Sequence, residues 1–173
     1  MVHAMAQDQR AGPTVVVRRA RPGDVPTVLA MVKELAEYED ATSEVSATES
    51  MLSLALFGER PAAYCHVVEC DGQVGGFALW FVNFSTWLGV HGIYLEDLYV
   101  RPAVRGLGLG EALLRALAEL CLERGYGRLE WSVLDRNAPA LGFYRALGAE
   151  AMQDWTVHRL AGDTLRALAR GAE

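Results

Sequence analysis

The chain has 173 residues, is 51% hydrophobic and carries a net charge of −6. This length suits one domain with a substantial core, because domains most often hold about 100–150 residues, and no apolar run reaches the roughly 20 residues that span a membrane. The sixteen basic residues form no run that could neutralise a phosphate backbone, so we expect neither nucleic acid nor a membrane as a partner.

The chain begins with a segment that shows no periodic pattern. Residues 1–13 lack the charged-then-apolar order of a signal peptide, so we expect a disordered leader, followed by a single domain over residues 14–173. The β-branched run over residues 14–19 predicts a first strand. Asp24 is a candidate N-cap for a helix whose apolar side chains share one face, and residues 48–57 predict a second helix.

A tight hairpin follows these helices. Asp71 and Gly72 separate two strand-like runs, residues 62–69 and 75–82, and an Asp-Gly pair is a strong signal for a two-residue hairpin turn. Beyond the hairpin, we expect residues 83–92 to form a loop that leads into the next strand.

The most informative stretch joins a strand, a glycine loop and a helix. The strand over residues 94–100 ends before Pro102, which has no N–H to donate to a sheet. Alternate glycines in residues 106–110 allow the backbone to approach a ligand, and a helix over residues 107–124 follows. The N–H groups and positive dipole at a helix start bind anions. The stretch therefore predicts a phosphate-binding site.

The remaining chain alternates strands and helices again. We expect strands over residues 128–134 and 155–160, and helices over residues 138–147 and 164–170. Together with the preceding elements they predict a mixed α/β fold with a largely antiparallel sheet and helices on both of its faces.

The glycine loop does not fit two common phosphate-binding patterns. A dinucleotide loop would need a glycine where Glu111 stands, and no Gly-Lys-Ser/Thr sequence closes a Walker loop. What remains is Arg105-x-x-Gly108-x-Gly110. This pattern resembles the acetyl-CoA loop of the GNAT N-acetyltransferases, which reads Gln/Arg-x-x-Gly-x-Gly/Ala.

Further motifs resemble one branch of that family, the diamine and polyamine acetyltransferases that act on spermidine, spermine and thialysine. The resemblance covers roughly residues 15–160. It implies a GNAT fold, acetyl-CoA as co-substrate, a small amine as acceptor and a homodimer. The motifs are residues 33–39, Trp87-Leu-Gly89, Tyr94-Leu-Glu-Asp97 and Asn137…Phe143-Tyr144…Gly148-Ala149.

The same resemblance implies which residues bind the cofactor. The strand that carries Glu96 would splay from the following strand, and the pantetheine arm would pair with backbone groups of Leu98 and Val100. Arg105 would contact a CoA phosphate or, alternatively, remain a solvated loop arginine. Asn137 would lie near the CoA arm. The pyrophosphate would be held by Gly106, Leu107, Gly108, Leu109, Gly110 and Glu111.

Acetyl transfer to an amine poses two proton problems. The ammonium group, with a pKa of about 10.4, must lose a proton, and the departing thiolate benefits from receiving one. We interpret Glu96 as the base, acting through water, and Tyr144 as the acid. The alternatives are a strand-end charge for Glu96 and an amphipathic core-edge residue for Tyr144. Asp97 is interpreted as structural or as a secondary electrostatic contact.

The amine acceptor is assigned by resemblance to residues at the acidic end of the first helix. Tyr38 and Glu39 would bind it together with Glu96, although a solvated acidic helix end is the alternative interpretation. Trp87 would add apolar and cation–π contact, whereas core or dimer packing is the preferred interpretation for the aromatic residues at positions 80–84.

Two rival chemistries are not expected. The histidines show no ligand spacing, so we predict no metal, and Cys121 lies on the apolar face of its helix, which argues against an acetyl-cysteine intermediate. The three cysteines form no C-x-x-C pair, which favours a reduced, cytoplasmic protein.

The sequence thus predicts a cytoplasmic N-acetyltransferase that moves acetyl from acetyl-CoA to a diamine, a polyamine or a lysine-like amino acid by direct attack. One alternative is a GNAT enzyme that acts on a protein N-terminus, a lysine side chain or an aminoglycoside. The other is a catalytically silent acyl-CoA-binding regulatory module, which would not need Glu96 and Tyr144 together.

Overall fold

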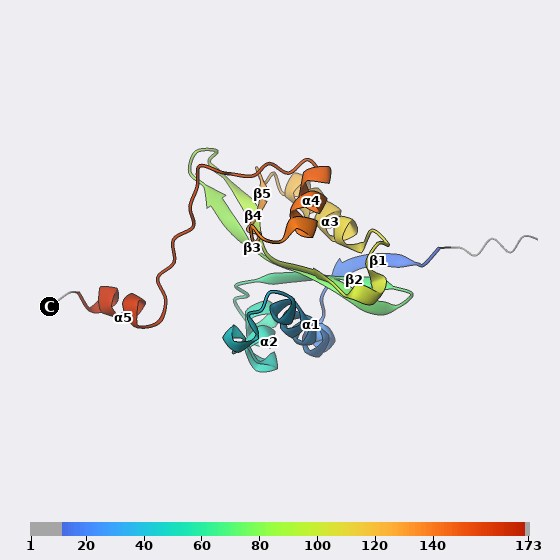
Figure 1. The fold of residues 1–173 in the computed structure, drawn as a ribbon, viewed down its shortest axis with the longest axis horizontal. Helices are drawn as coiled ribbons and strands as arrows, with labels where there is room; N and C mark the ends of the chain where they lie inside the picture. Colours follow the sequence, from blue (N-terminus) through green and yellow to red (C-terminus); the bar gives the residue numbers. More distant parts are fainter. Residues whose placement is uncertain (1–11, 172–173) are drawn as a thin grey trace, which may run out of the picture. The chain divides into compact units, whose positions relative to one another are not determined.

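The computed structural model describes residues 12–171 (Figure 1). Most of the predicted leader, residues 1–11, lies outside the described residues. The chain divides into two compact units, one ending at Ser132 and the other beginning at Val133. Among the described residues, the first unit holds the sheet and three α-helices, and the second holds two nine-residue helices, α4 (Ala138–Ala146) and α5 (Gly162–Arg170).

The described part of the first unit is built around one five-stranded sheet. Its strands lie in sequence order, the first four are antiparallel neighbours, and the last pair is parallel. The prediction of a mixed, largely antiparallel sheet is therefore confirmed. The strands are β1 (Val15–Arg19), β2 (Tyr64–Cys70), β3 (Gln73–Ser85), β4 (Val90–Val100) and β5 (Leu129–Trp131).

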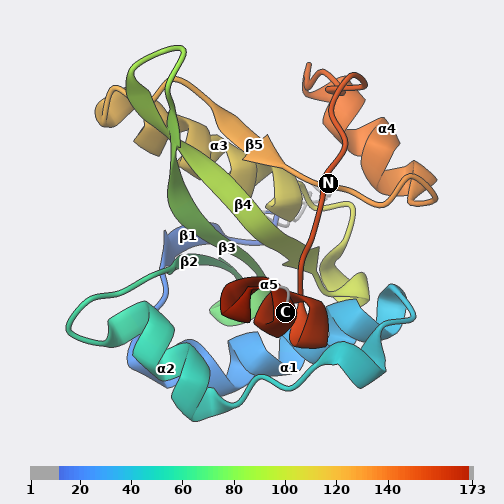
Figure 2. The ribbon, with the colours of Figure 1, turned by 90° about the vertical axis from the view of Figure 1, so that its left-hand side faces the viewer.

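Helices cover both faces of this sheet, as predicted. Figures 1 and 2 show α1 (Val25–Tyr38) and α2 (Glu49–Phe57) on one face and α3 (Leu109–Glu123) on the other. Within the described residues, no helix is both long enough and apolar enough to cross a bilayer.

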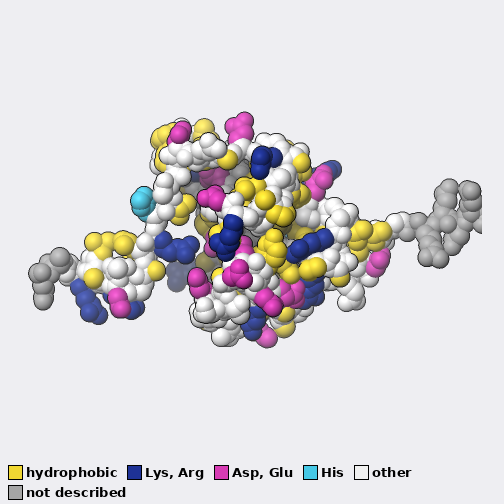
Figure 3. Space-filling view, in the orientation of Figure 1, with side chains coloured by type: hydrophobic (Ala, Val, Ile, Leu, Met, Phe, Trp, Pro, Cys, Tyr) yellow, Lys and Arg dark blue, Asp and Glu magenta, His cyan; other side chains and the backbone are white. Residues whose placement is uncertain are grey.

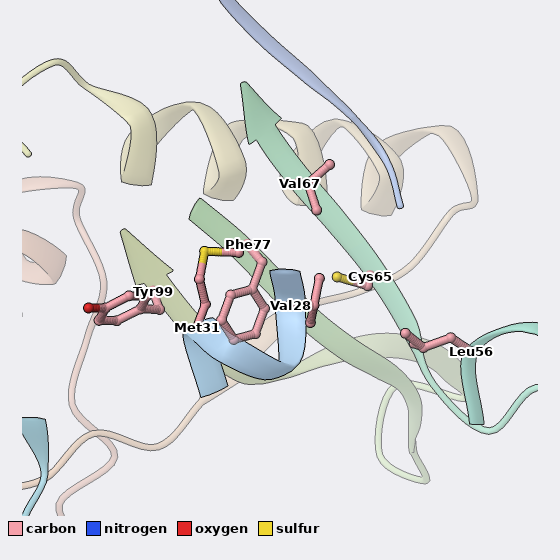
Figure 4. Packing of buried hydrophobic residues seen from close by; sticks show 7 residues of the cluster. All are labelled: Val28, Met31, Leu56, Cys65, Val67, Phe77 and Tyr99. Atoms are coloured by element: carbon pink, nitrogen blue, oxygen red, sulfur yellow. The ribbon is translucent and has the colours of Figure 1, made fainter. Parts of the chain in front are cut away.

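The core under α1 and α2 fixes how these helices sit against the sheet. Val67, Phe77 and Tyr99 lie opposite one another on three adjacent strands, and Val28 and Met31 of α1 pack against them (Figure 4). Phe77 is fully buried. This packing places the end of α1 beside the second half of β4.

Local signals determine several helix ends. The side-chain oxygen of Thr48 accepts the N–H of Met51 and caps α2. Asp24 precedes α1 but does not cap it with its side chain. Its carboxylate instead accepts the N–H of Arg21 at 2.6 Å and pairs with Arg18 at 2.7 Å, so it ties a short 3-10 turn to β1.

The hairpin between β3 and β4 is longer than predicted. Residues 83–92 were expected to form a loop, but they continue the ladder from the pair Asn83–Gly92 to the pair Ser85–Val90. Cross-strand pairing outweighs the local loop signal here. The Asp71–Gly72 turn is as expected, with both residues at positive φ.

Two predicted strands are reduced or missing. β5 has three residues, in place of the seven predicted over residues 128–134. Residues 155–160 form no strand in the described structure. A strand requires a partner for its backbone groups, and the described part of the second unit contains no other strand.

Candidate functional site

The site is organised by an irregularity in β4. Leu95 and Asp97 lie opposite neighbouring residues of β3, so Glu96 is the extra residue of a β-bulge. A bulge shifts the period-two alternation, and Asp97 consequently shares a face with Leu79 and Tyr99, the face covered by α1. Two consecutive carboxylates are thus placed at one point of the sheet.

Asp97 is the electrostatically unusual member of this pair. Burial, and next the charges of Glu96 and Glu39, raise the pKa of the Asp97 carboxyl from 3.8 to about 6. A carboxylate that titrates nearer to neutral pH is better suited to accept a proton. From the sequence, Asp97 is interpreted as structural or as a secondary electrostatic contact, because nothing local in the sequence reveals the bulge at this position.

β4 and β5 separate just before this point, as the resemblance implies. They pair only from Ile93 to Leu95 of β4, so later residues of β4 have no partner in β5 among the described residues. The N–H of Arg101 binds the carbonyl of Gly75 at 2.9 Å. In an antiparallel ladder this bond means that Val100, and Leu98 two residues earlier, turn their N–H and C=O away from β3.

This geometry makes Leu98 and Val100 suitable for the role expected of them. Their backbone groups face the side from which β5 has departed, where an extended amide-bearing chain such as pantetheine can pair with β4. Their contact with CoA stays a prediction, but the strand edge that it requires is present.

The glycine loop leads directly into α3. Gly106 and Gly108 have φ values of 79° and 77°, in the left-handed region that other residues rarely adopt. The N–H of Ala112 makes the first helical bond, to the carbonyl of Gly108 at 2.9 Å. The N–H groups of residues 109–111 precede it, as an anion site requires. α3 begins two residues later than predicted because Gly108 is not helical.

An open hollow of about 500 Å³ borders the start of α3. Gly108, Glu111 and Arg115 contribute to its lining, together with Val17 of β1. Glu111 and Arg115 form an ion pair at 2.6 Å on the exposed side of the helix. The hollow adjoins the predicted pyrophosphate loop but does not include the two carboxylates of β4.

Arg105 points back toward β4 in this structure. Its Nε donates a hydrogen bond to the carbonyl of Val100 at 2.9 Å. Its guanidinium carbon lies 5.6 Å from the ring centre of Tyr38 and 5.7 Å from that of Tyr99. The predicted contact of Arg105 with a CoA phosphate stays a prediction.

The end of α1 brings the expected acceptor residues toward β4. α1 ends at Tyr38. Two residues later Asp40 adopts a positive φ of 58°, and the N–H of Ala41 binds the carbonyl of Ala36 at 2.8 Å. Tyr38 is half exposed. Glu39 is close enough to Asp97 to raise its pKa. The structure therefore gathers Tyr38 and Glu39 near the bulge.

Trp87 lies elsewhere in the sheet unit. It is 86% exposed, in the turn that precedes β4. Glu96 follows Val90 by six positions along β4, a distance of roughly 20 Å at about 3.3 Å per residue. Within one chain, the sheet does not bring Trp87 to the carboxylates.

The second unit carries the two remaining expected residues. Asn137 is the N-cap of α4, and its side-chain oxygen accepts the N–H of Ala140 at 3.2 Å. Tyr144 lies on the same helix, with its ring 5.2 Å from that of Phe143. The contact of Asn137 with CoA and the acid role of Tyr144 stay predictions.

Cys65 and Cys121 are poor nucleophiles in this fold. Cys121 is buried on the inner face of α3, as predicted, and burial raises the pKa of its thiol. Burial also raises the pKa of Cys65 to about 12. Thiols in such surroundings are unreactive because they remain protonated at neutral pH.

Surface charge on the face shown in Figure 3 is mixed. Acidic side chains (magenta) and basic side chains (blue) are interspersed around α1 and α2. Among the described residues visible there, they form no continuous basic surface of the kind that binds nucleic acid.

Known proteins share both the sequence and the fold. The model of the acetyltransferase (GNAT) family matches residues 31–149. Thialysine N-epsilon-acetyltransferase of Bos taurus is 37% identical over 166 residues, covering 90% of this chain and 97% of the relative. L-ornithine N5-acetyltransferase of Arabidopsis thaliana is 30% identical, covering 88% and 86% of the two chains.

Solved structures extend the likeness of the fold. An integron cassette protein from the mobile metagenome of V. cholerae superimposes with a TM-score of 0.77 and 26% identity, covering 92% of this chain and all of the other. An aminoglycoside acetyltransferase from an uncultured soil sample superimposes with a TM-score of 0.70 at 19% identity. At that identity the second likeness concerns the fold alone.

Proposed function

Since the chain belongs to the acetyltransferase (GNAT) family, we propose that its acceptor is the primary amine of a small diamine, polyamine or lysine-like amino acid. The chain is an acetyl-CoA-dependent N-acetyltransferase. Thialysine and ornithine, the acceptors named for two relatives, are both small amino acids with a second amine.

The observation that carries this proposal is the acidic surrounding of the β4 bulge. Glu96 and Asp97 lie at the point where β4 loses its neighbour β5, and Glu39 lies close enough to influence Asp97. Such carboxylates attract a small cation, because each ammonium group gains a favourable charge interaction beside them.

The proposed reaction needs two proton transfers. Acetyl-CoA supplies the thioester, whose acetyl carbon forms the new C–N bond while its C–S bond breaks. Glu96, assisted by Asp97, removes the proton that the attacking ammonium group must lose. Tyr144 donates its hydroxyl proton to the sulfur that leaves. Tyr38 and Glu39 hold the distal part of the acceptor, and Trp87 remains a candidate contact for it.

Free CoA release against a panel of acceptors tests the proposal. The panel contains spermidine, putrescine, lysine, thialysine, an aminoglycoside and a peptide with a free N-terminus. We expect turnover on the small aliphatic amines and little on the last two. Turnover on the peptide or the aminoglycoside alone would reject the acceptor class while leaving acetyl-CoA chemistry intact.

Glu96→Gln and Tyr144→Phe test the two proton roles. Both variants should lower kcat more than they raise either KM, because each removes a proton transfer rather than a binding contact. A Tyr144→Phe enzyme with undiminished turnover would remove Tyr144 as the acid. If Tyr144→Phe instead raised only the KM for acetyl-CoA, Tyr144 would have a role in binding the cofactor rather than in proton transfer.

The homodimer and the cytoplasmic location belong to the same proposal and rest on the resemblance to the polyamine branch. Light scattering of the purified protein at micromolar concentration tests the first. A mass of one chain, which is 18.9 kDa, would contradict it.

A further inference from the structure

The side chain of Arg105 joins two parts of the site that are distant in sequence. It belongs to the glycine loop, yet its Nε donates to the carbonyl of Val100 at 2.9 Å. Its guanidinium lies between the rings of Tyr38, at the end of α1, and Tyr99, in β4. The contact with Tyr38 links the cofactor loop to the expected acceptor residues.

The β4 side of this arrangement is held firmly. Tyr99 is 6% exposed, and burial, followed by the nearby carboxylate of Glu34, raises the pKa of its hydroxyl. Glu34 is paired in turn with the guanidinium of Arg101 at 2.9 Å. Arg105 therefore lies over a ring that is itself buried in the fold.

The α1 side of this arrangement is more exposed than the β4 side. Tyr38 is the last residue of α1 and is 49% exposed, and the chain reverses directly after it. Helix ends open locally more readily than helix interiors. A guanidinium held over the Tyr38 ring limits the positions that this turn can adopt.

We infer that Arg105 is a positioning residue for the acceptor: by cation–π contact with both Tyr99 and Tyr38, it fixes the end of α1 that binds the amine. The inference rests on the proposed function, in which Tyr38 and Glu39 contact the acceptor. It gives Arg105 a role in amine recognition in addition to, or in place of, the phosphate contact expected from its place in the loop.

The two roles predict different kinetic results. In the positioning role, Arg105→Gln raises KM for the amine by about two- to fivefold, the range expected for loss of one exposed cation–π contact. KM for acetyl-CoA changes less. Arg105→Lys restores part of the loss, because an ammonium also binds a ring face but cannot lie flat between two rings.

A double-mutant cycle with Tyr38 identifies the contact. Tyr38→Leu removes the ring, so adding Arg105→Gln to it should raise the amine KM little further. Tyr38→Phe keeps the ring and should remain sensitive to Arg105→Gln. Fully additive effects of Tyr38→Leu and Arg105→Gln would overturn the inference, as would a rise in the acetyl-CoA KM alone.

A matched control exists in the same unit. Arg124 also lies over two aromatic rings, 5.9 Å from that of Trp80 and 5.8 Å from that of Tyr126, but at the far end of α3. Arg124→Gln removes a similar contact without touching Tyr38. An equal change in amine KM in this variant would show that the effect of Arg105 is a general loss of stability and would reject the inference.

Hydrogen exchange separates this inference from the proposed function. Amides in the last turn of α1, residues 35–39, should exchange faster in Arg105→Gln than in the parent protein, whatever substrate the enzyme uses. A parent enzyme that acetylates none of the small amines rejects the proposed acceptor. Unchanged exchange at residues 35–39 rejects the positioning role, independently of the acceptor.

Discussion

Replacing Asp97 by Asn should stabilise the protein at neutral pH. Burial, with the charges of Glu96 and Glu39, raises the pKa of Asp97 from 3.8 to about 6. The folded state therefore holds a proton that the unfolded state has already lost between pH 3.8 and 6. Stability falls as pH rises through this window, because the folded state must then accommodate the ionised carboxylate.

The size of the effect follows from the shift. A difference between pKa values of 3.8 and about 6 corresponds to an upper limit of about 3 kcal/mol above pH 6. Asn has the same shape but no charge, so Asp97→Asn should add about 1–3 kcal/mol at pH 7.5. The gain should vanish near pH 4, where the Asp97 carboxyl is neutral in the folded state.

Urea unfolding of both proteins at several pH values measures this gain. The difference in unfolding free energy should rise between pH 4 and 6 and then level off. Glu96→Gln is the control, because it removes one of the charges that act on Asp97 but leaves the buried carboxyl in place, so its gain should be smaller. A difference for Asp97→Asn that is constant from pH 4 to 8 would refute the reasoning. Activity should fall in the same variant if, as proposed, the Asp97 carboxylate assists Glu96 in the reaction.

Three further predictions concern the acid, the glycine loop and the core. Tyr144→Phe should lower kcat by about 10²-fold or more, as loss of a general acid typically does, and steady-state CoA release measures it; a change confined to KM would contradict this. Gly108→Ala, at a φ of 77°, should cost about 1–2 kcal/mol in thermal unfolding and raise KM for acetyl-CoA. Gly72→Ala, at a φ of 79° in the β2–β3 turn, should cost a similar amount but leave the KM for acetyl-CoA unchanged. Equal KM values for acetyl-CoA in the two variants would contradict a role of the glycine loop in binding acetyl-CoA. Phe77→Ala should cost about 3–5 kcal/mol in urea unfolding, because its ring is fully buried between α1 and the sheet, and a loss below 1 kcal/mol would contradict that packing.

Elements with a local signal were predicted well from the sequence. Thr48 caps α2 and the Asp71–Gly72 pair closes its hairpin, since each effect involves neighbours in the chain. α3 was placed within two residues because its apolar residues recur along one face. The family resemblance was also confirmed.

Features that depend on distant partners could not be predicted in this way. The ladder over residues 83–92 forms because two strands pair, and the sequence of either strand alone does not reveal it. Residues 155–160 have a strand-like pattern but find no partner strand in the described second unit. The side chain of Arg105 fits a phosphate loop by sequence, yet in the fold it contacts rings from α1 and β4.

The partly buried carboxyl of Asp97 and the buried imidazole of His66 give the sheet opposite responses to acid. Burial lowers the pKa of His66 from 6.5 to about 4, and its Nδ1 accepts the Trp80 indole N–H at 3.0 Å. Between pH 4 and 6.5 the unfolded state binds the proton that folded His66 does not, so His66 contributes stability that is lost as pH falls. Asp97 contributes in the other direction over nearly the same range, and each contribution is limited to about 3 kcal/mol. The parent protein should therefore show a nearly flat stability between pH 4 and 6. Asp97→Asn removes the contribution of Asp97 and leaves that of His66, so the stability of this variant should fall steeply as pH falls from 6 to 4. A variant whose stability does not change over this range would contradict the burial of the His66 imidazole.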